Sequence, residues 1–418
     1  MKTHTYFKMI AVISLLGTML ACNIITTPGP GVATDTPDAG PGIATDTPGL
    51  PPPAIALLRI AYIKGDNVWL WTDGSGSTQL TFSGGATSPV LSGDALEVAF
   101  LRAGELWAVN ADGTAERQLI NSAYLATLEA APDTAEVNKV VWRPGTHTIY
   151  FNTLAVAGIP GYRIPRHDLN SIDADLGFAS LVVLEPAGSG GVPYVSPDNT
   201  HLALAQPDKV IIVEPTGANY TVALTFDFVL TYSEWAYIPE LVWLPDSSGV
   251  RMVAPAPDPL GDPSQLSTFW NIPVSGAPSV LTTFLALPVF MSFPYISPDG
   301  NNALYLGDVV GGHGIHSITA GGADTYYTWF PSGNVDLVGW NPDSIHITYW
   351  QTPTQARYLA VGVDNPLGDT PMVTKVKWLN STQYLFMNGN ELRKADLGLP
   401  STLIDSGVTE FDWGILIY

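Results

Sequence analysis

The sequence predicts an all-β fold, a β-propeller made of four-stranded antiparallel blades. Short apolar segments alternate with Gly- and Pro-containing turns along most of the chain. One phrase of strand, Ser-Pro-Asp turn and strand occurs twice, at Pro193–Asn199 and at Pro294–Gly300, and weaker copies occur elsewhere. A period of about 40–50 residues with four strands per unit is typical of propeller blades. We expect eight blades, with seven as the alternative.

The composition agrees with this fold class. Of 418 residues, 46% are hydrophobic and 13% charged, with 35 Pro, 40 Gly, 12 Trp and 17 Tyr. Many turns and many aromatic residues favour strands over long helices. The formal charge of −21 repels nucleic acid and anionic lipid surfaces, so neither is an expected partner.

Residues 1–21 are predicted to be a signal peptide. The apolar run Met9–Leu20 follows Lys2 and Lys8, and it is shorter than the ~20 residues that a membrane-spanning helix needs. Ala21 and Cys22 come next, which resembles a bacterial lipoprotein signal. That resemblance implies lipidation of Cys22 and an extracytoplasmic protein anchored to the cell membrane. The alternative is ordinary secretion with a spare thiol. Cys22 is the only cysteine, so a disulfide within the chain is excluded.

Residues 22–54 are expected to hold the lipidated cysteine and a disordered linker rich in Thr, Pro and Gly. The linker contains a tandem repeat, Pro30–Pro37 and Pro41–Pro48. Such a composition cannot form a packed core, and frequent Pro keeps the chain extended. The propeller domain is assigned to residues 55–418.

The first strands of the domain show the repeat directly. Three predicted strands, with a turn at Asp73-Gly74, are followed by a second set with a turn at Asp112-Gly113. The first set is Arg59–Ile63, Asn67–Trp71 and Thr78–Phe82, and the second is Glu97–Leu101, Gly104–Val109 and Arg117–Ile120.

A further strand comes between successive sets and ends at a Ser-Pro-Asp-Gly-like turn. Pro298 fixes φ in the clearest copy, Asp299 tolerates the next position, and Gly300 accepts a positive φ. The last apolar residue of each copy marks the repeat: Leu91, Trp142, Val195, Trp243, Ile296, Trp340, Trp378 and Trp413. We interpret the turn residues Asp198, Asp246, Asp299 and Asp343 as turn formers and not as catalytic acids. The repeated Trp residues are interpreted as packing between blades.

The two ends of the domain are complementary. Phe411–Gly414 is a first strand with no blade after it, and Arg59–Ile63 is a second strand with no first strand before it. Joined, they would complete one blade from both termini and leave no free edge. In the seven-blade alternative, Ile415–Tyr418 is the last strand of a blade.

These motifs resemble the repeats of TolB-like and WD-like propellers. Ser297-Pro298-Asp299-Gly300 matches the family turn fully, Ser196-Pro197-Asp198-Asn199 matches except at Asn199, and Glu105–Gly113 matches the later segment. The resemblance covers Arg59–Tyr418. The resemblance implies the fold but not the function, because propellers of this kind occur as interaction modules, as peptidase lids and in lipoproteins.

Catalytic and cofactor motifs are missing from the sequence. It has no Gly-x-Ser-x-Gly elbow and no phosphate-binding Gly-rich loop. We therefore expect no catalytic residues, no cofactor and no metal, and we favour a non-enzyme over an enzyme. His313 and His316 are weak metal candidates. Asp168–Gly177 is interpreted as a turn of the third blade, with a weak Ca²⁺ site as the alternative, because Ile172 stands where a ligand is needed.

Four inserted loops are the expected binding elements, because loops on a rigid scaffold carry binding more often than the scaffold does. They are Leu154–Pro165, Phe228–Pro239, Pro255–Ser267 and Gly307–Gly314. Aromatic contacts could come from Trp235, Tyr237, Tyr326, Tyr327, Trp329 and Phe330. The expected function is binding or scaffolding for a protein, peptide or glycan. The alternative is a hydrolase or lyase of envelope polymers, with carboxylates of raised pKa converging in the central channel.

Overall fold

The computed structural model describes residues 56–157, 163–233, 235–287, 295–309, 312–331, 336–352, 355–370 and 372–417. The predicted signal peptide, Cys22 and the linker lie outside these residues and stay predictions. Within the described ranges, no helix combines the length and the apolar character that crossing a bilayer would require.

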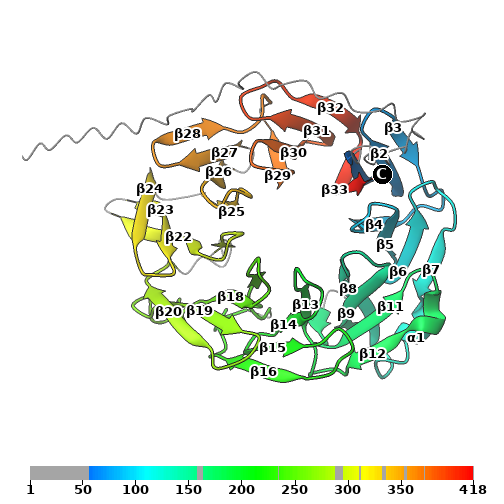
Figure 1. The fold of residues 1–418 in the computed structure, drawn as a ribbon, viewed down its shortest axis with the longest axis horizontal. Helices are drawn as coiled ribbons and strands as arrows, with labels where there is room; N and C mark the ends of the chain where they lie inside the picture. Colours follow the sequence, from blue (N-terminus) through cyan, green and yellow to red (C-terminus); the bar gives the residue numbers. More distant parts are fainter. Residues whose placement is uncertain are drawn as a thin grey trace, which may run out of the picture. The chain divides into compact units, whose positions relative to one another are not determined.

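The described residues of the domain form an eight-bladed β-propeller, so the predicted fold class and the higher of the two blade numbers are confirmed (Figure 1). Seven of the eight sheets have four antiparallel strands, and the third has five. We number the blades along the chain and name the four strand positions of a blade first to fourth, starting from the central axis.

The first four blades contain the following elements, given from the first to the last strand. Blade 1 consists of β33 (Val408–Ile417), β1 (Ala56–Lys64), β2 (Asn67–Thr72) and β3 (Gly76–Gln79). Blade 2 consists of β4 (Ala86–Leu91), β5 (Glu97–Arg102), β6 (Glu105–Asn110) and β7 (Arg117–Ile120), followed by helix α1 (Ser122–Leu125). Blade 3 consists of β8 (Thr134–Trp142), β9 (Thr148–Val156), β10 (Arg163–Pro165), β11 (Leu169–Asp173), the 3₁₀-helix η1 (Gly177–Ser180) and β12 (Val182–Glu185). Blade 4 consists of β13 (Val192–Val195), β14 (Leu202–Ala205), β15 (Lys209–Val213) and β16 (Thr221–Thr225).

The other four blades follow the same order. Blade 5 consists of β17 (Val242–Trp243), β18 (Gly249–Ala254), β19 (Ser267–Pro273) and β20 (Ser279–Phe284). Blade 6 consists of β21 (Tyr295–Ile296), β22 (Asn302–Val309), β23 (Gly312–Thr319) and β24 (Asp324–Pro331). Blade 7 consists of β25 (Asp336–Trp340), β26 (Ile347–Thr352), β27 (Gln355–Ala360) and β28 (Val363–Pro366). Blade 8 consists of β29 (Val373–Trp378), β30 (Gln383–Asn388), β31 (Glu391–Asp396) and β32 (Thr402–Ser406).

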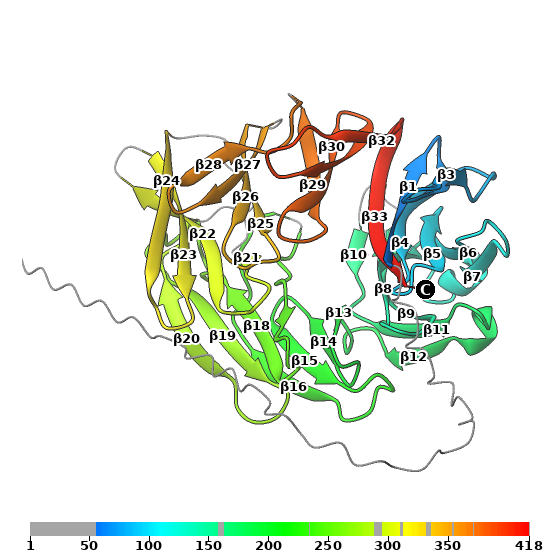
Figure 2. The ribbon, with the colours of Figure 1, turned by 45° about the horizontal axis from the view of Figure 1, so that its top comes forward.

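Blade 1 is completed by both ends of the domain, as predicted. The C-terminal strand β33 pairs with β1, with Trp413 opposite Ile60 and Phe411 opposite Tyr62. Figure 2 shows the two strands side by side, red against blue. The seven-blade alternative is wrong, because residues 415–417 continue this same first strand and do not form the last strand of a blade.

The third strand of the first predicted set lies slightly earlier than expected. It was predicted at Thr78–Phe82, but β3 ends at Gln79. The ladder stops there because the N–H groups of Leu80 and Thr81 both point to the Val68 carbonyl, while the Thr81 hydroxyl accepts from the Val68 N–H. The chain therefore curls over the end of β2 and leaves the sheet.

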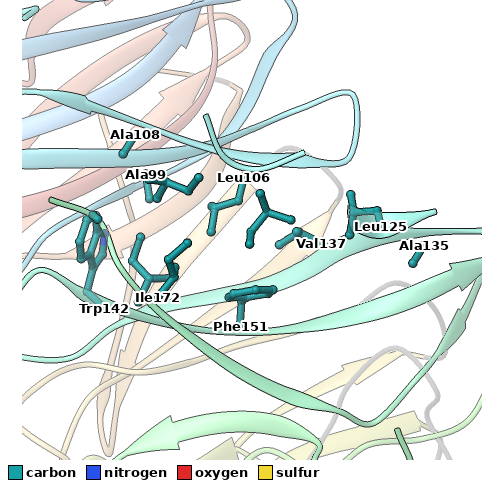
Figure 3. Close-up of a cluster of buried hydrophobic side chains, with 13 residues drawn as sticks. Ala99, Leu106, Ala108, Leu125, Ala135, Val137, Trp142, Phe151 and Ile172 are labelled. Carbon is teal, nitrogen blue, oxygen red and sulfur yellow. The ribbon is translucent and has the colours of Figure 1, made fainter. Parts of the chain in front are cut away.

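Neighbouring blades share apolar cores. One cluster joins β5 and β6 of blade 2 to β8, β9 and β11 of blade 3, with Leu125 of helix α1 at its edge. Figure 3 shows Phe151 and Val137 facing Leu106 across this interface. Burial of such surface contributes about 25 cal/mol per Å², so the interfaces between blades hold the ring together.

The repeated Trp residues form specific contacts between blades. The Trp142 indole donates a hydrogen bond to the Val90 carbonyl of the preceding blade at 3.0 Å. Trp243 and Trp340 donate in the same way to the carbonyls of Tyr194 (3.0 Å) and Tyr295 (2.8 Å). The predicted packing role is confirmed. The indole N–H groups also form directional hydrogen bonds between blades, which the composition does not predict.

Antiparallel pairing places the connections on two opposite faces. Turns between the first and second strands and between the third and fourth strands lie on one face, which we call the turn face. Hairpins between the second and third strands and connections between blades lie on the other, which we call the loop face. The Ser-Pro-Asp turns belong to the turn face, and Gly300 and Asn199 have the positive φ that was predicted, 74° and 62°.

Candidate functional site

The long loops singled out in the sequence belong to the loop face. The β9–β10 hairpin includes residues 158–162, which lie outside the described ranges. Gly307–Gly314 is mainly a hairpin and not a loop, because β22 continues to Val309 and β23 begins at Gly312. The two segments that remain, between β16 and β17 and between β18 and β19, are neighbours.

The segment between β16 and β17 forms a concave surface that we call the loop pocket. Its cavity of about 490 Å³ is lined by Phe228, Leu230, Thr231, Tyr232, Ser233, Trp235 and Ala236. Pockets of 300–1,000 Å³ are typical of ligand-binding sites.

Alternation along the chain builds this pocket. Val229 and Thr231 are buried, whereas Phe228, Leu230 and Tyr232, which alternate with them, are exposed. The backbone of Tyr232 is left-handed, with φ 53°, and this reverses the chain. The Thr231 hydroxyl then donates to the Trp235 carbonyl at 2.7 Å and closes the curve.

The segment between β18 and β19 supports the loop pocket. The Leu230 N–H donates to the Pro257 carbonyl at 2.8 Å, and the Tyr232 hydroxyl donates to Asp258 Oδ1 at 2.9 Å. Asp258 is held in turn by the Gly261 N–H. The pocket is therefore attached to a second ordered loop.

The surface of the loop pocket is strongly apolar. Phe228, Leu230, Tyr232 and Trp235 are 48%, 46%, 68% and 42% exposed. The described lining residues carry hydroxyls but no carboxylate, amide or guanidinium group. Acidic residues stand beside it, with Asp227 next to Phe228 in the chain and Asp258 at the Tyr232 hydroxyl.

A second cavity, of about 450 Å³, lies on the turn face between blades 2 and 3. Its ionisable lining residues are Arg59, Glu97, Asp112, His147 and Asp175. Glu97, His147 and Asp175, with Asp94 and Arg117 that contact them, form a group that we call the polar cluster. His147 Nε2 lies 3.0 Å from Asp94 Oδ2, and its Nδ1 lies 2.8 Å from Asp175 Oδ2 and 3.8 Å from Glu97 Oε1. Arg117 Nη2 is 2.5 Å from Glu97 Oε1.

Burial and charge act against each other in the polar cluster. Burial alone would lower the pKa of His147, but hydrogen bonds with Asp175 and Asp94 outweigh it and raise that pKa above its ordinary value. Burial also raises the pKa of Glu97, although Arg117 and His147 oppose the shift. The Asp175 carboxylate is held to a lowered pKa, first by its hydrogen bond to His147.

The two predicted metal-candidate histidines do not share a site. Each has its own carboxylate in blade 6, His313 with Asp308 at 3.4 Å and His316 with Asp324 at 3.0 Å. Because they are three residues apart on β23, their side chains leave the backbone on opposite faces of the sheet.

The oxygen-rich segment Asp168–Gly177 is only in part the predicted turn. Its first half is strand β11, and Asp168 is buried, where its carboxylate accepts from the Thr153 N–H and hydroxyl. The turn proper begins at Asp173, whose side chain accepts from the Asp175 N–H at 2.9 Å. Asp168 and Asp175 therefore lie at opposite ends of a strand, too far apart to share one Ca²⁺ ion.

The repeated Asp residues form turns, as predicted. Asp198 and Asp299 accept from the preceding Ser hydroxyls, Ser196 and Ser297, at 2.7 and 2.5 Å. Of the six predicted aromatic contacts, Trp235 lines the loop pocket, while Tyr237 and Phe330 are buried. Tyr326 and Trp329 are exposed on β24 of another blade, and Tyr327 is partly buried.

The channel side of the propeller shows little sign of the alternative catalytic site. Two carboxylates of β33 are held by the backbone of β4, since the N–H groups of Ser88 and Leu91 donate to Glu410 and Asp412. The pKa of Glu240, just before β17, is raised by burial. Glu410 and Asp412 lie on β33 of blade 1, where backbone N–H groups of β4 hold both, whereas Glu240 precedes β17 in blade 5.

Sequence reasoning missed most of both cavities. Phe228, Leu230 and Tyr232 lie in a loop that was predicted, and their alternation was the signal that could have identified them. Glu97 and His147 were not singled out, because their partners come from different turns of two blades and leave no spacing to recognise.

No model of a protein family matches the sequence, and no curated protein matches it either. Among solved structures, the chain is similar to a eukaryotic initiation factor, at 10% identity over 85% of this chain and 98% of that one, with a TM-score of 0.50. It is also similar to the Dos1 propeller, at 10% identity over 78% and 84% of the two chains, with a TM-score of 0.51. TolB from Agrobacterium tumefaciens is 16% identical over 57% and 94% of the chains, with a TM-score of 0.34. Such identities show the fold alone. The likeness to the Dos1 propeller agrees with the β-propeller fold that the Ser-Pro-Asp-Gly repeats predict.

Proposed function

We propose that this protein is a binding module that takes a segment of a partner protein or peptide in the loop pocket. An apolar side chain of the partner would enter the cavity, and basic residues beside it would face the acidic groups around the rim. In this proposal the domain works outside the cytoplasm, held at the membrane through lipidated Cys22.

One observation carries the proposal: four large apolar side chains are exposed together around one cavity. Soluble proteins seldom expose grouped apolar surface unless it binds something. Trp and Tyr are also the residues that most often dominate binding energy. A glycan is a weaker candidate, because sugar hydroxyls need polar side chains for orientation and the described lining offers only hydroxyl groups.

A peptide library displayed on phage and selected on the full chain tests this function. We expect enrichment of peptides with one aromatic or large aliphatic residue near Lys or Arg, and binding that weakens with salt. Trp235→Ala should lower the affinity of the selected peptides about tenfold or more.

The matched control is Trp329→Ala, which removes an indole that is 45% exposed, close to the 42% of Trp235, from β24 of another blade. It should leave peptide affinity unchanged. Selected peptides that bind the Trp235→Ala variant as tightly as the wild type would exclude the loop pocket as the binding site.

A further inference from the structure

The polar cluster departs from the way in which equivalent turns meet elsewhere in the ring. Between blades 4 and 5, the Asp198 N–H donates to the Ser247 hydroxyl at 3.1 Å. Between blades 6 and 7, the Asp299 N–H donates to the Ser344 hydroxyl, also at 3.1 Å. One neutral hydrogen bond is therefore enough to join these turns, and holding blades 2 and 3 together does not explain five ionisable groups.

One oxygen of the cluster is unsatisfied. Glu97 is 3% exposed, and its Oε1 is bound by Arg117, but its buried Oε2 has no hydrogen-bond partner among the described residues. A buried carboxylate oxygen without a partner costs free energy. The Glu97 Oε2 lone pairs are therefore available to a cationic ligand.

The orientation of His147 indicates that a metal ion could bind beside Glu97. With Nε2–H donated to Asp94, the other ring nitrogen, Nδ1, faces Glu97 and Asp175. A carboxylate that fixes one nitrogen of a histidine while the other binds a metal is a recurring arrangement in metalloproteins. The Trp142 ring packs edge-on against the imidazole at 6.3 Å and restricts its rotation.

The distances suit a small divalent cation. One donor atom from each of Glu97, His147 and Asp175 lies within 4.8 Å of the others. Donors around a tetrahedral Zn²⁺ at about 2.1 Å are roughly 3.4 Å apart. The observed separations from Nδ1, 2.8 Å to Asp175 and 3.8 Å to Glu97, lie on either side of that value.

Charge favours the same ligand. Three carboxylates and one guanidinium leave the polar cluster with a net charge of about −2 when His147 is neutral. The Arg117 guanidinium lies 2.5 Å from Glu97 Oε1 and 3.7 Å from Asp175 Oδ1 and offsets one of these charges, and the Ala174 carbonyl (2.7 Å) and Asn110 (3.1 Å) fix its position. Ca²⁺ takes oxygen donors, whereas an imidazole nitrogen suits Zn²⁺ and related transition metals.

We propose that Glu97, His147 and Asp175 form a binding site for a divalent transition metal of the zinc class, with Asp94 as the residue that positions His147. The site lies on the turn face and is independent of the loop pocket and of the binding function proposed for it.

Titration of the full chain with Zn²⁺ by calorimetry tests the site, in a Cys22→Ser background so that the only thiol does not bind the probe. We expect one Zn²⁺ per chain bound through the cluster. Asp175→Asn and His147→Gln should each weaken binding about tenfold or more, and Asp94→Asn should weaken it roughly 10–100-fold by releasing the second nitrogen. Affinity should fall as the pH decreases from 8 to 6, because the metal must displace the Nδ1 proton.

Matched controls are His201→Gln and Asp246→Asn, which change one histidine and one turn aspartate of other blades. They should bind Zn²⁺ like the parent chain. Thermal unfolding in EDTA identifies any variant that fails to fold. If Asp175→Asn fails to fold, Asp94→Asn, which keeps all three donor residues, serves as the second variant. The proposal is overturned if Zn²⁺ does not bind at pH 8, if Ca²⁺ binds equally well, or if folded cluster variants bind like the controls.

Discussion

At the scale of single residues, the repeated turns show how one backbone requirement selects one residue type. Gly300 has φ 74°, and a Cβ placed there would lie 2.6 Å from Leu244 Cδ2 of the neighbouring blade. Asn199 fills the corresponding place in blade 4 with φ 62°. Asn is among the few side chains that tolerate this conformation. The turn therefore needs a left-handed residue and, in blade 6, also a small one.

Gly300→Ala separates these two requirements. We expect it to lower the free energy of unfolding by about 1–2 kcal/mol for the left-handed backbone, and by more because the new methyl group meets Leu244. Gly74→Ala is the matched control, since Gly74 has the same φ of 74° but nothing within 4 Å of its Cβ position. Urea denaturation of both variants measures the difference. Equal losses would mean that Leu244 moves aside at no cost and that the contact between blades is unimportant.

At the scale of elements, the first strand of each blade is the best-predicted part of the molecule. Its last apolar residue was identified in all eight copies, and in seven of them the strand ends at that residue. Trp413 is the exception, because β33 has no turn to enter and continues to Ile417. Outer strands were predicted less well, as the early end of β3 at Gln79 shows. Edge strands have fewer partners, so one side-chain hydrogen bond such as that of Thr81 can end them.

Trp243→Phe tests the bond that ties the first strands of neighbouring blades together. An aromatic ring, although a smaller one, would remain, but the Tyr194 carbonyl would lose the indole N–H from which it accepts a hydrogen bond at 3.0 Å. An unsatisfied buried carbonyl costs about 1–3 kcal/mol, so the midpoint of urea unfolding should fall accordingly. Trp329→Phe, at an exposed position of β24, should change it little. Similar midpoints of urea unfolding for the two variants would mean that the hydrogen bond of Trp243 adds nothing to stability and that Trp243 contributes only through packing.

At the scale of the whole molecule, repetition decides what a sequence can predict. Eight blades and their closure follow from motifs that recur, since each copy is an independent reading of the same structure. The polar cluster has no copy. His147 occupies a turn position that holds Ser248 in blade 5, and Asp175 comes from a turn whose pattern in the sequence is only that of a loop. Their meeting depends on how two blades stack, which no local pattern encodes.

Closure of the ring gives the last prediction. Strand β33 contacts three blades: it pairs with β1, its Asp412 accepts from the Leu91 N–H of blade 2 at 3.0 Å, and the same carboxylate pairs with Lys377 of blade 8 at 3.0 Å. Removing residues 408–418 would expose β1 as an unpaired edge and open contacts on both sides. We expect the truncated chain to lose cooperative thermal unfolding and to aggregate.

A peptide of residues 408–418 added to the truncated chain should restore cooperative unfolding, because it supplies the missing strand without the covalent link. A peptide of the same composition in scrambled order is the control and should not restore it, since pairing with β1 depends on register. If the truncated chain unfolds cooperatively at the wild-type temperature without any peptide, seven complete blades are stable alone. Closure would then serve to protect the edge of β1 and would add nothing to the stability of the ring.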